Sequence, residues 1–132
     1  MMQFQANVNG MQHALSYIEK TIELYSFPLR KDKQICIIAD EVLSNIVQYA
    51  YPLNEGVFFV KIKRKKNKIQ MQFCDNGIPF NPLLKEASNI NESYQNRSIG
   101  GLGIHIVKQL SNRIKYKRRK GKNIVTVIVS CS

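Results

Sequence analysis

The sequence contains no tryptophan, only three cysteines and no long hydrophobic run. No apolar stretch approaches the roughly 18 residues that a membrane-crossing helix needs, so we expect no transmembrane span. The N-terminal stretch MMQFQANVNGMQH has no basic segment followed by an apolar one, so we expect no signal peptide. Cys36, Cys74 and Cys131 form no C-x-x-C pair, which argues against a disulfide framework or a zinc site and favours a cytoplasmic protein.

Acidic residues are also scarce, because the chain has nine Asp and Glu against 20 Lys and Arg, for a formal net charge of +11. The cationic residues are concentrated at 61–68 and 115–122, and each of these segments lies between two strand-like runs. Clustered positive charge attracts nucleic acid or an acidic partner protein. Tyr116 is the single aromatic residue in these two segments, so base stacking has little support. We therefore expect exposed hairpin turns rather than a nucleic-acid site.

Hydrophobic periodicity predicts three helices and five strands. Apolar residues recur at helical spacing over 11–25 and 30–50, and a glycine-rich turn opens a third helix at GGLGIHIVKQLSN. The strands alternate apolar and polar residues over part of their length, and they are expected at 2–9, 57–64, 68–74, RIKYKRR and NIVTVIVS. The polar segment at about 78–99 is long for a connection inside a compact domain, which is typical of a lid or binding loop.

The order of these elements, β-α-α-β-β-lid-α-β-β, separates the helices from strands that are joined by hairpins. The sequence therefore predicts an α+β fold. We expect a two-layer α/β sandwich with the helices on one face of a mixed, mostly antiparallel sheet. A chain of 132 residues with one such set of elements is expected to form a single domain, 1–132.

The first place where polar residues interrupt an apolar pattern is ADEVLSNIVQYAY, in the second predicted helix. Glu41 and Asn45 are four residues apart and therefore lie on one helix face, next to the apolar stripe. An exposed polar pair is the ordinary explanation of such spacing. A carboxylate and an amide on one face can also perform chemistry. An amide oxygen suits Mg²⁺, and a carboxylate can accept a proton from an attacking hydroxyl.

The second and third interruptions are FCDNGIPFNP and GGLGIHIV. Asp75 ends a predicted strand, where it could form an ordinary turn or accept a hydrogen bond from an exocyclic amine such as that of adenine. Gly77 would allow a flat ring to approach the backbone. Gly100, Gly101 and Gly103 open a predicted helix, whose free N–H groups and dipole favour a phosphate, although a simple flexible connection has the same composition.

Together, the three segments resemble a known family, the GHKL (Bergerat-fold) ATPases. The resemblance is greatest to its small stand-alone branch, the serine kinases that act as bacterial anti-sigma factors. DEVLSNIVQYAY resembles the N box of that family, DNGIPFNP its adenine-binding G1 box, and GGLGIHIVKQL its G2 box. The order and spacing also match, and the resemblance covers nearly the whole chain. Tyr49 stands where many members have histidine, and we expect no phospho-acceptor helix pair of the histidine-kinase type.

The resemblance implies ATP and Mg²⁺ as cofactors and a role for each matching residue. Glu41 is expected to be the general base and Asn45 the Mg²⁺ ligand. Asp75 is expected to accept the adenine amino group, and Gly77 to shape the pocket floor. The other nucleotide-binding residues that the resemblance implies are Gly100, Gly101 and Gly103 in the phosphate turn, and Thr126 on the last strand. In the lid, Arg97 could reach a γ-phosphate, although a solvated side chain is the simpler explanation.

The resemblance further implies an ATP-dependent protein serine kinase that acts as an anti-sigma factor. Its substrate would be a STAS-domain anti-anti-sigma protein, its alternative partner a sigma factor, and its assembly a homodimer. The alternative is a non-catalytic regulatory domain that binds ATP or ADP and sequesters a protein partner. Glu41 favours the kinase, because a domain that only binds nucleotide needs no carboxylate there.

Overall fold

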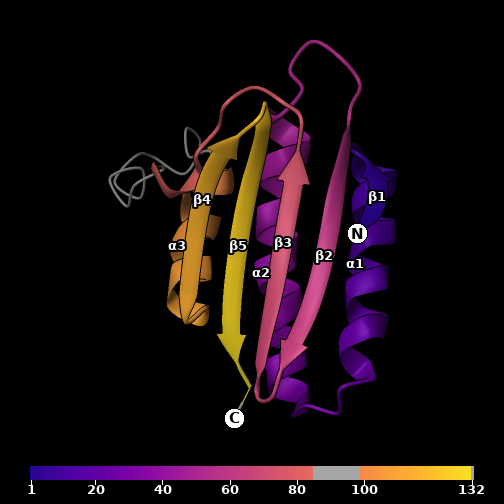
Figure 1. Ribbon diagram of the computed structural model, residues 1–132, viewed down its shortest axis with the longest axis vertical. Coiled ribbons are helices and arrows are strands. Elements are labelled where there is room, and N and C mark those ends of the chain that lie inside the picture. Colours follow the sequence, from indigo (N-terminus) through magenta and orange to yellow (C-terminus); the bar gives the residue numbers. More distant parts are fainter. Residues whose placement is uncertain (85–98, 132) are drawn as a thin grey trace.

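The computed structural model describes residues 1–84 and 99–131. Within these residues, five strands form one sheet in the order β1-β2-β3-β5-β4, and every neighbouring pair is antiparallel. The three α-helices of the same part of the chain lie on one face of the sheet, behind it in Figure 1. The predicted two-layer α+β architecture is confirmed, and the described sheet is antiparallel throughout.

Most elements begin and end within a few residues of the predicted positions. Their bounds are β1 Met2–Gln5, α1 Val8–Glu23, α2 Leu29–Tyr49, β2 Val57–Lys65, β3 Lys68–Asp75, the 3₁₀ turn η1 Pro82–Leu84, α3 Ile99–Leu110, β4 Arg113–Arg119 and β5 Lys122–Ser130. The clearest difference is at the N-terminus, where the predicted strand 2–9 is too long. Asn7 ends it by capping α1, since its Oδ1 accepts a hydrogen bond from the Gly10 N–H at 2.8 Å.

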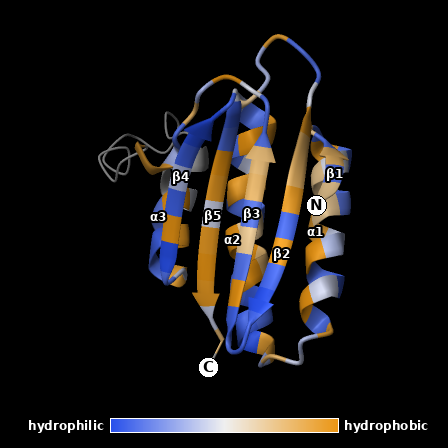
Figure 2. Ribbon diagram, viewed as in Figure 1, coloured by the Kyte–Doolittle hydropathy of each residue, from blue (hydrophilic) through white to orange (hydrophobic). Residues whose placement is uncertain are grey.

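The hydrophobic core lies between the helices and the sheet. β5 contributes alternate residues to it, because successive strand side chains point to opposite faces. Figure 2 shows β5 as largely hydrophobic and β4 as largely hydrophilic. β5 is paired on both sides, whereas β4 is an edge strand, and charged side chains on an edge strand oppose pairing with other molecules.

The fold brings the polar segments of the sequence to neighbouring positions. The end of α2 meets the turn after β3, where the Ile78 N–H donates to the Ala50 carbonyl oxygen at 2.9 Å. α3 packs against α2, so that Gly103 lies beside Glu41. Segments far apart in sequence therefore converge along the C-terminal half of α2.

Candidate functional site

Glu41 and Asn45 lie one turn apart on α2. Asn45 is 3% exposed, and neither its Oδ1 nor its Nδ2 has a hydrogen-bond partner among the described residues. Glu41 is half-buried, and its Oε2 also lacks a partner there. Burial raises the pKa of Glu41 above its ordinary value of 4.5, and the charge of Asp40 adds to the rise. A buried polar group left unpartnered costs about 1–3 kcal/mol, so such a pattern is typical of a site that a ligand completes.

Gly103 of α3 lies directly against Glu41. A Cβ built at Gly103 would overlap the Glu41 carboxylate, so a larger residue here would require the Glu41 side chain to move. Gly100 and Gly101 lie in the first turn of the same helix. The first-turn N–H groups of a helix have no partner inside the helix and attract anions. The beginning of α3 and the predicted base are therefore neighbours.

Asp75, the last residue of β3, is 4% exposed. Its Oδ1 accepts hydrogen bonds from the Gly77 N–H at 2.9 Å and from Asn123 Nδ2 at 2.8 Å. Burial raises the pKa of Asp75, while these two bonds and the charge of Arg118 oppose the rise. Because both bonds from described residues use Oδ1, Oδ2 can accept a further bond from a ligand.

Gly77 allows the turn after β3 to contact the end of α2. A Cβ built at Gly77 would overlap the backbone carbonyl of Ala50. Arg118 on β4 holds the same turn, because its Nη1 donates to the Gly77 carbonyl oxygen at 2.8 Å. The missing side chain at position 77 therefore serves a contact within the protein, and the approach of a flat ring to this glycine stays a prediction.

A small cavity lies between Asn45 and Asp75. Its volume is about 20 Å³, which is room for about one water molecule and not for a purine. The ring of Phe80 forms part of its wall and stacks on the ring of Tyr49, with centroids 4.9 Å apart and an interplanar angle of 17°. The other lining residues are Val42, Ile46, Ala50, Pro82, Asn123 and Val125. A nucleotide base could enter here only if this wall moved.

The structure does not bring Thr126 to this cavity. Its side chain lies on the opposite face of the sheet, where its Oγ1 accepts a hydrogen bond from Gln72 Nε2 at 3.3 Å. Asn123 lies at the cavity instead, and the sequence interpretation missed it. The alternation in NIVTVIVS carried the signal, because Asn123 is in phase with the buried valines and Thr126 is out of phase.

Asn123 connects the end of β3 to the loop that follows it. It is 3% exposed, and its Nδ2 donates to Asp75 Oδ1 and to the Ile78 carbonyl oxygen, the latter at 2.7 Å. Its Oδ1 accepts from the Phe80 N–H at 3.2 Å and from the Tyr116 hydroxyl. These four bonds use the full capacity of a side-chain amide. Asn123 therefore fixes both the Asp75 carboxylate and the backbone of the residue that closes the cavity.

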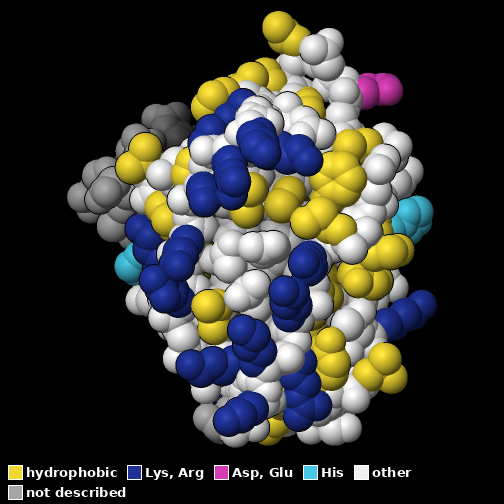
Figure 3. Space-filling view, viewed as in Figure 1, with side chains coloured by type: hydrophobic (Ala, Val, Ile, Leu, Met, Phe, Trp, Pro, Cys, Tyr) yellow, Lys and Arg dark blue, Asp and Glu magenta, His cyan; other side chains and the backbone are white. Residues whose placement is uncertain are grey.

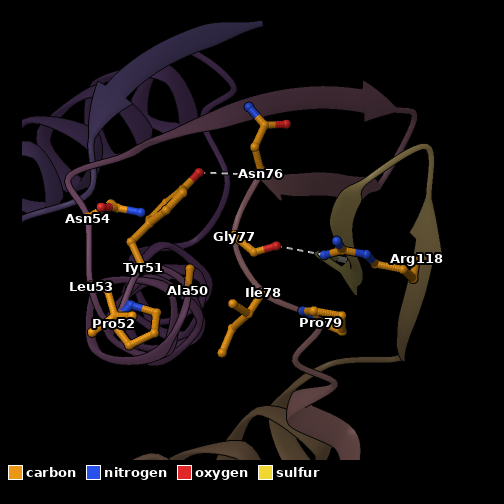
Figure 4. A pocket seen from close by; sticks show the side chains of 10 residues that line it. All are labelled: Ala50, Tyr51, Pro52, Leu53, Asn54, Asn76, Gly77, Ile78, Pro79 and Arg118. Carbon is orange, nitrogen blue, oxygen red and sulfur yellow. Dashed lines mark hydrogen bonds between the residues drawn. The ribbon is translucent and has the colours of Figure 1, made fainter.

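A larger pocket of about 400 Å³ lies on the outer side of the same turn (Figure 4). The Tyr51 hydroxyl donates to the Val57 carbonyl oxygen at 2.6 Å and accepts from the Asn76 N–H at 2.8 Å. Gly77, predicted to shape the nucleotide pocket, lines this pocket, but Glu41 and Asn45 do not. We assign it to the support of the turn rather than to chemistry.

The predicted lid at about 78–99 falls mostly outside the described residues, and so does Arg97. The described part contains the short turn η1 and the cavity wall at Phe80.

Residues 4–129 match the family model of the histidine kinase-like ATPase domain. This chain belongs to the histidine kinase-like ATPase family. Two similar curated proteins are protein kinases. The serine/threonine-protein kinase BtrW of Bordetella bronchiseptica is 26% identical over 104 residues, which cover 78% of this chain and 72% of BtrW. The serine-protein kinase RsbW of Bacillus mycoides is 25% identical over 105 residues, which cover 76% of this chain and 64% of RsbW.

Solved histidine kinases share the fold. The nucleotide-free catalytic domain of the histidine kinase ThkA is 12% identical with a TM-score of 0.55, covering 99% of this chain and 97% of that domain. The histidine kinase domain of the blue-light activated kinase from Erythrobacter litoralis is 20% identical with a TM-score of 0.56, covering 79% of this chain and 46% of that one. At such identities the likeness concerns the fold alone.

The described residues, 1–84 and 99–131, lack two features. No helix in this part of the chain is long and apolar enough to cross a membrane. The same residues contain no group of three or more His, Cys, Asp or Glu side chains that could hold a metal ion.

Proposed function

We propose that this chain is an ATP-dependent protein serine kinase that acts as an anti-sigma factor and phosphorylates a STAS-domain anti-anti-sigma protein. The observation that carries the proposal is the set of buried, unpartnered polar atoms of Glu41 and Asn45, beside Gly103 of α3. A helix face that only packed against its neighbours would carry apolar side chains there. In a family of ATPases, the phosphate end of ATP is the ligand that best completes this arrangement.

The adenine end of the nucleotide would bind at Asp75. Oδ1 of this carboxylate is held by Gly77 and Asn123, so Oδ2 is oriented before any ligand arrives. An exocyclic amino group is a donor that matches this acceptor. The cavity wall at Phe80 would have to open for the ring to enter, because about 20 Å³ cannot hold it.

Asn45 fits a Mg²⁺ ligand. Its Oδ1 is a hard oxygen donor that is buried and has no partner among the described residues. The cation, when bound, would supply neutralisation of the charge that develops on the transferred phosphate. Its other ligands would be phosphate and water oxygens, because the described residues contain no cluster of acidic or imidazole side chains for it.

Glu41 would act as the general base. It would take the proton of a serine hydroxyl as the serine Oγ attacks the γ-phosphorus. The new O–P bond forms while the bond from the γ-phosphorus to the bridging oxygen breaks, and the electron pair of that bond leaves on ADP. Because burial raises the pKa of Glu41, its ionised form is a stronger base than an exposed glutamate.

The partners in this proposal rest on two supports. The first is the resemblance of the three boxes to the anti-sigma branch of the family. The second is the similarity to two proteins whose names describe serine kinases. A sigma factor as alternative partner and a homodimeric assembly belong to the same proposal.

A binding-only regulatory domain is the second candidate function. The oriented Asp75 carboxylate and the unpartnered Asn45 would serve nucleotide binding alone equally well, and the cavity would have to open for a base in either case. Its Glu41 carboxylate would then have no chemical role, and replacing it would leave the function intact.

Calorimetric binding of ATP·Mg²⁺ and transfer of ³²P from γ-labelled ATP to a purified STAS-domain protein of the same organism test the proposal. Wild type should bind and transfer phosphate. Asp75→Asn should lose at least about tenfold in affinity, which corresponds to one charged hydrogen bond. Glu19→Gln on the exposed face of α1 is the control and should behave as wild type. Binding without transfer would favour the regulatory domain, and no binding would contradict both candidates.

A further inference from the structure

The face of the sheet that points away from the helices carries a net positive charge. Figure 3 looks onto this face and shows Lys and Arg side chains spread over it, with acidic side chains only at its margin. Strand alternation places nine cationic side chains and, among the described residues, no acidic one on the open face. They are Lys61, Lys63, Lys65, Lys68, Arg113, Lys115, Lys117, Arg119 and Lys122.

The strand register arranges seven of these cations in two rows, while Lys68 and Lys122 are the first residues of the two strands between the rows. β2 and β4 carry the rows, and β3 and β5 lie between them. One cross-strand rung consists of Lys61, Gln72, Thr126 and Lys115. The next rung consists of Lys63, Gln70, Ile128 and Arg113. These two rungs each have a cation at both ends and uncharged side chains across the two central strands, whereas the neighbouring rung has Phe59 at one end and Lys117 at the other.

The dimensions of this arrangement suit a helix. The two rows are three strand spacings apart, or about 14 Å, whereas an α-helix with its side chains is about 10–12 Å across. The row on β4 runs from Arg113 to Arg119, a length of about 20 Å, which corresponds to about 13 helical residues. A helix lying along the strands would thus have the cationic row of β4 on one side over this length. On its other side it would have Lys61 and Lys63 of β2, which face Lys115 and Arg113.

The uncharged side chains between the two cationic rows favour a protein partner over a nucleic acid. Ile124 and Ile128 are half-buried on this face, and Phe59 lies in the same rung as Ile124. A phosphate backbone has no apolar surface for these side chains to contact, whereas an amphipathic helix has an apolar face. Most of the cations are lysines, whereas arginine is the side chain whose fork matches a phosphate.

We propose that the open face of the sheet docks an acidic amphipathic helix of a partner protein. The apolar residues of that helix would contact Ile124 and Ile128, and its carboxylates would pair with the two cationic rows. This surface is separate from the candidate nucleotide site, because Asn45 and Asp75 lie on the helix side of the sheet. The proposal does not depend on kinase activity.

The test uses a synthetic helical peptide of about 14 residues, with leucines on one face and glutamates on both flanks. Fluorescence anisotropy would measure its affinity for the full chain at two salt concentrations. Lys61→Gln combined with Lys115→Gln, which removes both ends of one rung, should weaken binding about five- to tenfold. Lys20→Gln combined with Arg30→Gln removes the same charge on the helix side and should change affinity less than twofold.

The apolar contact is tested separately. Ile128→Thr keeps a β-branched side chain in the strand and should weaken peptide binding at least threefold, while a peptide of scrambled order should bind weakly to wild type. Equal losses in the two charge variants, or no effect of Ile128→Thr, would overturn the proposal in favour of a net-charge effect. Tighter binding of a random DNA duplex, indifferent to Ile128→Thr, would overturn it in favour of nucleic acid. Failure of the peptide to bind would also contradict it.

Discussion

Two buried asparagines of the candidate site differ in their hydrogen bonding. Asn45 and Asn123 are each 3% exposed and line the same cavity. Asn123 makes four hydrogen bonds, whereas both polar atoms of Asn45 lack partners among the described residues. The hydrogen bonds of Asn123 compensate for the burial of its polar atoms. The burial of the polar atoms of Asn45 costs free energy that no hydrogen bond from the described residues offsets.

The difference separates a complete half of the site from an incomplete one. Around Asp75, the protein supplies its own hydrogen bonds, so the carboxylate is oriented in advance and less ordering remains for binding. Along α2, Glu41 and Asn45 present polar atoms that no described residue satisfies. Such local costs are common at functional sites and are offset by packing elsewhere.

Removing the predicted base should have the largest effect. We expect Glu41→Gln to slow phosphotransfer by about 10²–10⁴-fold, because glutamine cannot accept the proton. ATP affinity should change less than threefold, as the side chain keeps its size. Single-turnover transfer from ATP and calorimetry measure the two quantities. Phosphotransfer at the wild-type rate in this variant would contradict the role of Glu41 as the general base.

Adding a side chain at Gly77, in the turn after β3, should lower the stability of the protein. A methyl group at Gly77 would meet the rigid backbone of Ala50, so Gly77→Ala should lower the free energy of unfolding by about 1–3 kcal/mol in urea. Gly121→Asn is the control. Gly121 has a φ of +75° and nothing within 4 Å of a built Cβ, and asparagine tolerates positive φ. A Gly77→Ala protein as stable as this control would show that the turn can shift freely.

A change in the pKa of Glu41, made by replacing its neighbour Asp40, should have the smallest effect. Burial is the first cause of its raised pKa and the charge of Asp40 the second. A base must be ionised, so activity should fall as pH drops through this pKa, which lies above the ordinary value for glutamate. Asp40→Asn removes a negative neighbour and should move that acid limb to lower pH. The pH profile of kcat/KM tests this, and a shift to higher pH would have the wrong sign.

The sequence predicted the elements and the three polar segments because each depends on local pattern. Helical spacing located α1 and α2, and it placed the beginning and end of α2 within one residue. The beginning of α1 was missed, because the Asn7 cap competes with an alternating strand pattern in the same residues. Glu41 and Asn45 were paired correctly on one helix face, since i,i+4 spacing alone determines that.

Features that depend on long-range register were harder to predict. The two basic segments were interpreted as separate hairpin turns, and Figure 1 places those turns at opposite ends of the sheet. Only the pairing of β2, β3, β5 and β4 shows that their lysines form two facing rows. The closure of the cavity by Phe80 is equally invisible in sequence, because it depends on how the loop after β3 folds back.

The most direct test replaces each buried asparagine by leucine, which has nearly the same shape, and measures urea unfolding. Asn45→Leu should raise the free energy of unfolding by about 1–2 kcal/mol and abolish Mg²⁺-dependent ATP binding, because it removes two unpartnered polar atoms. Asn123→Leu should lower it by about 2–4 kcal/mol, because Asp75 and the backbone at Ile78 and Phe80 lose their partner. If both substitutions destabilise the protein equally, Asn45 is an ordinary core residue and the central claim is wrong.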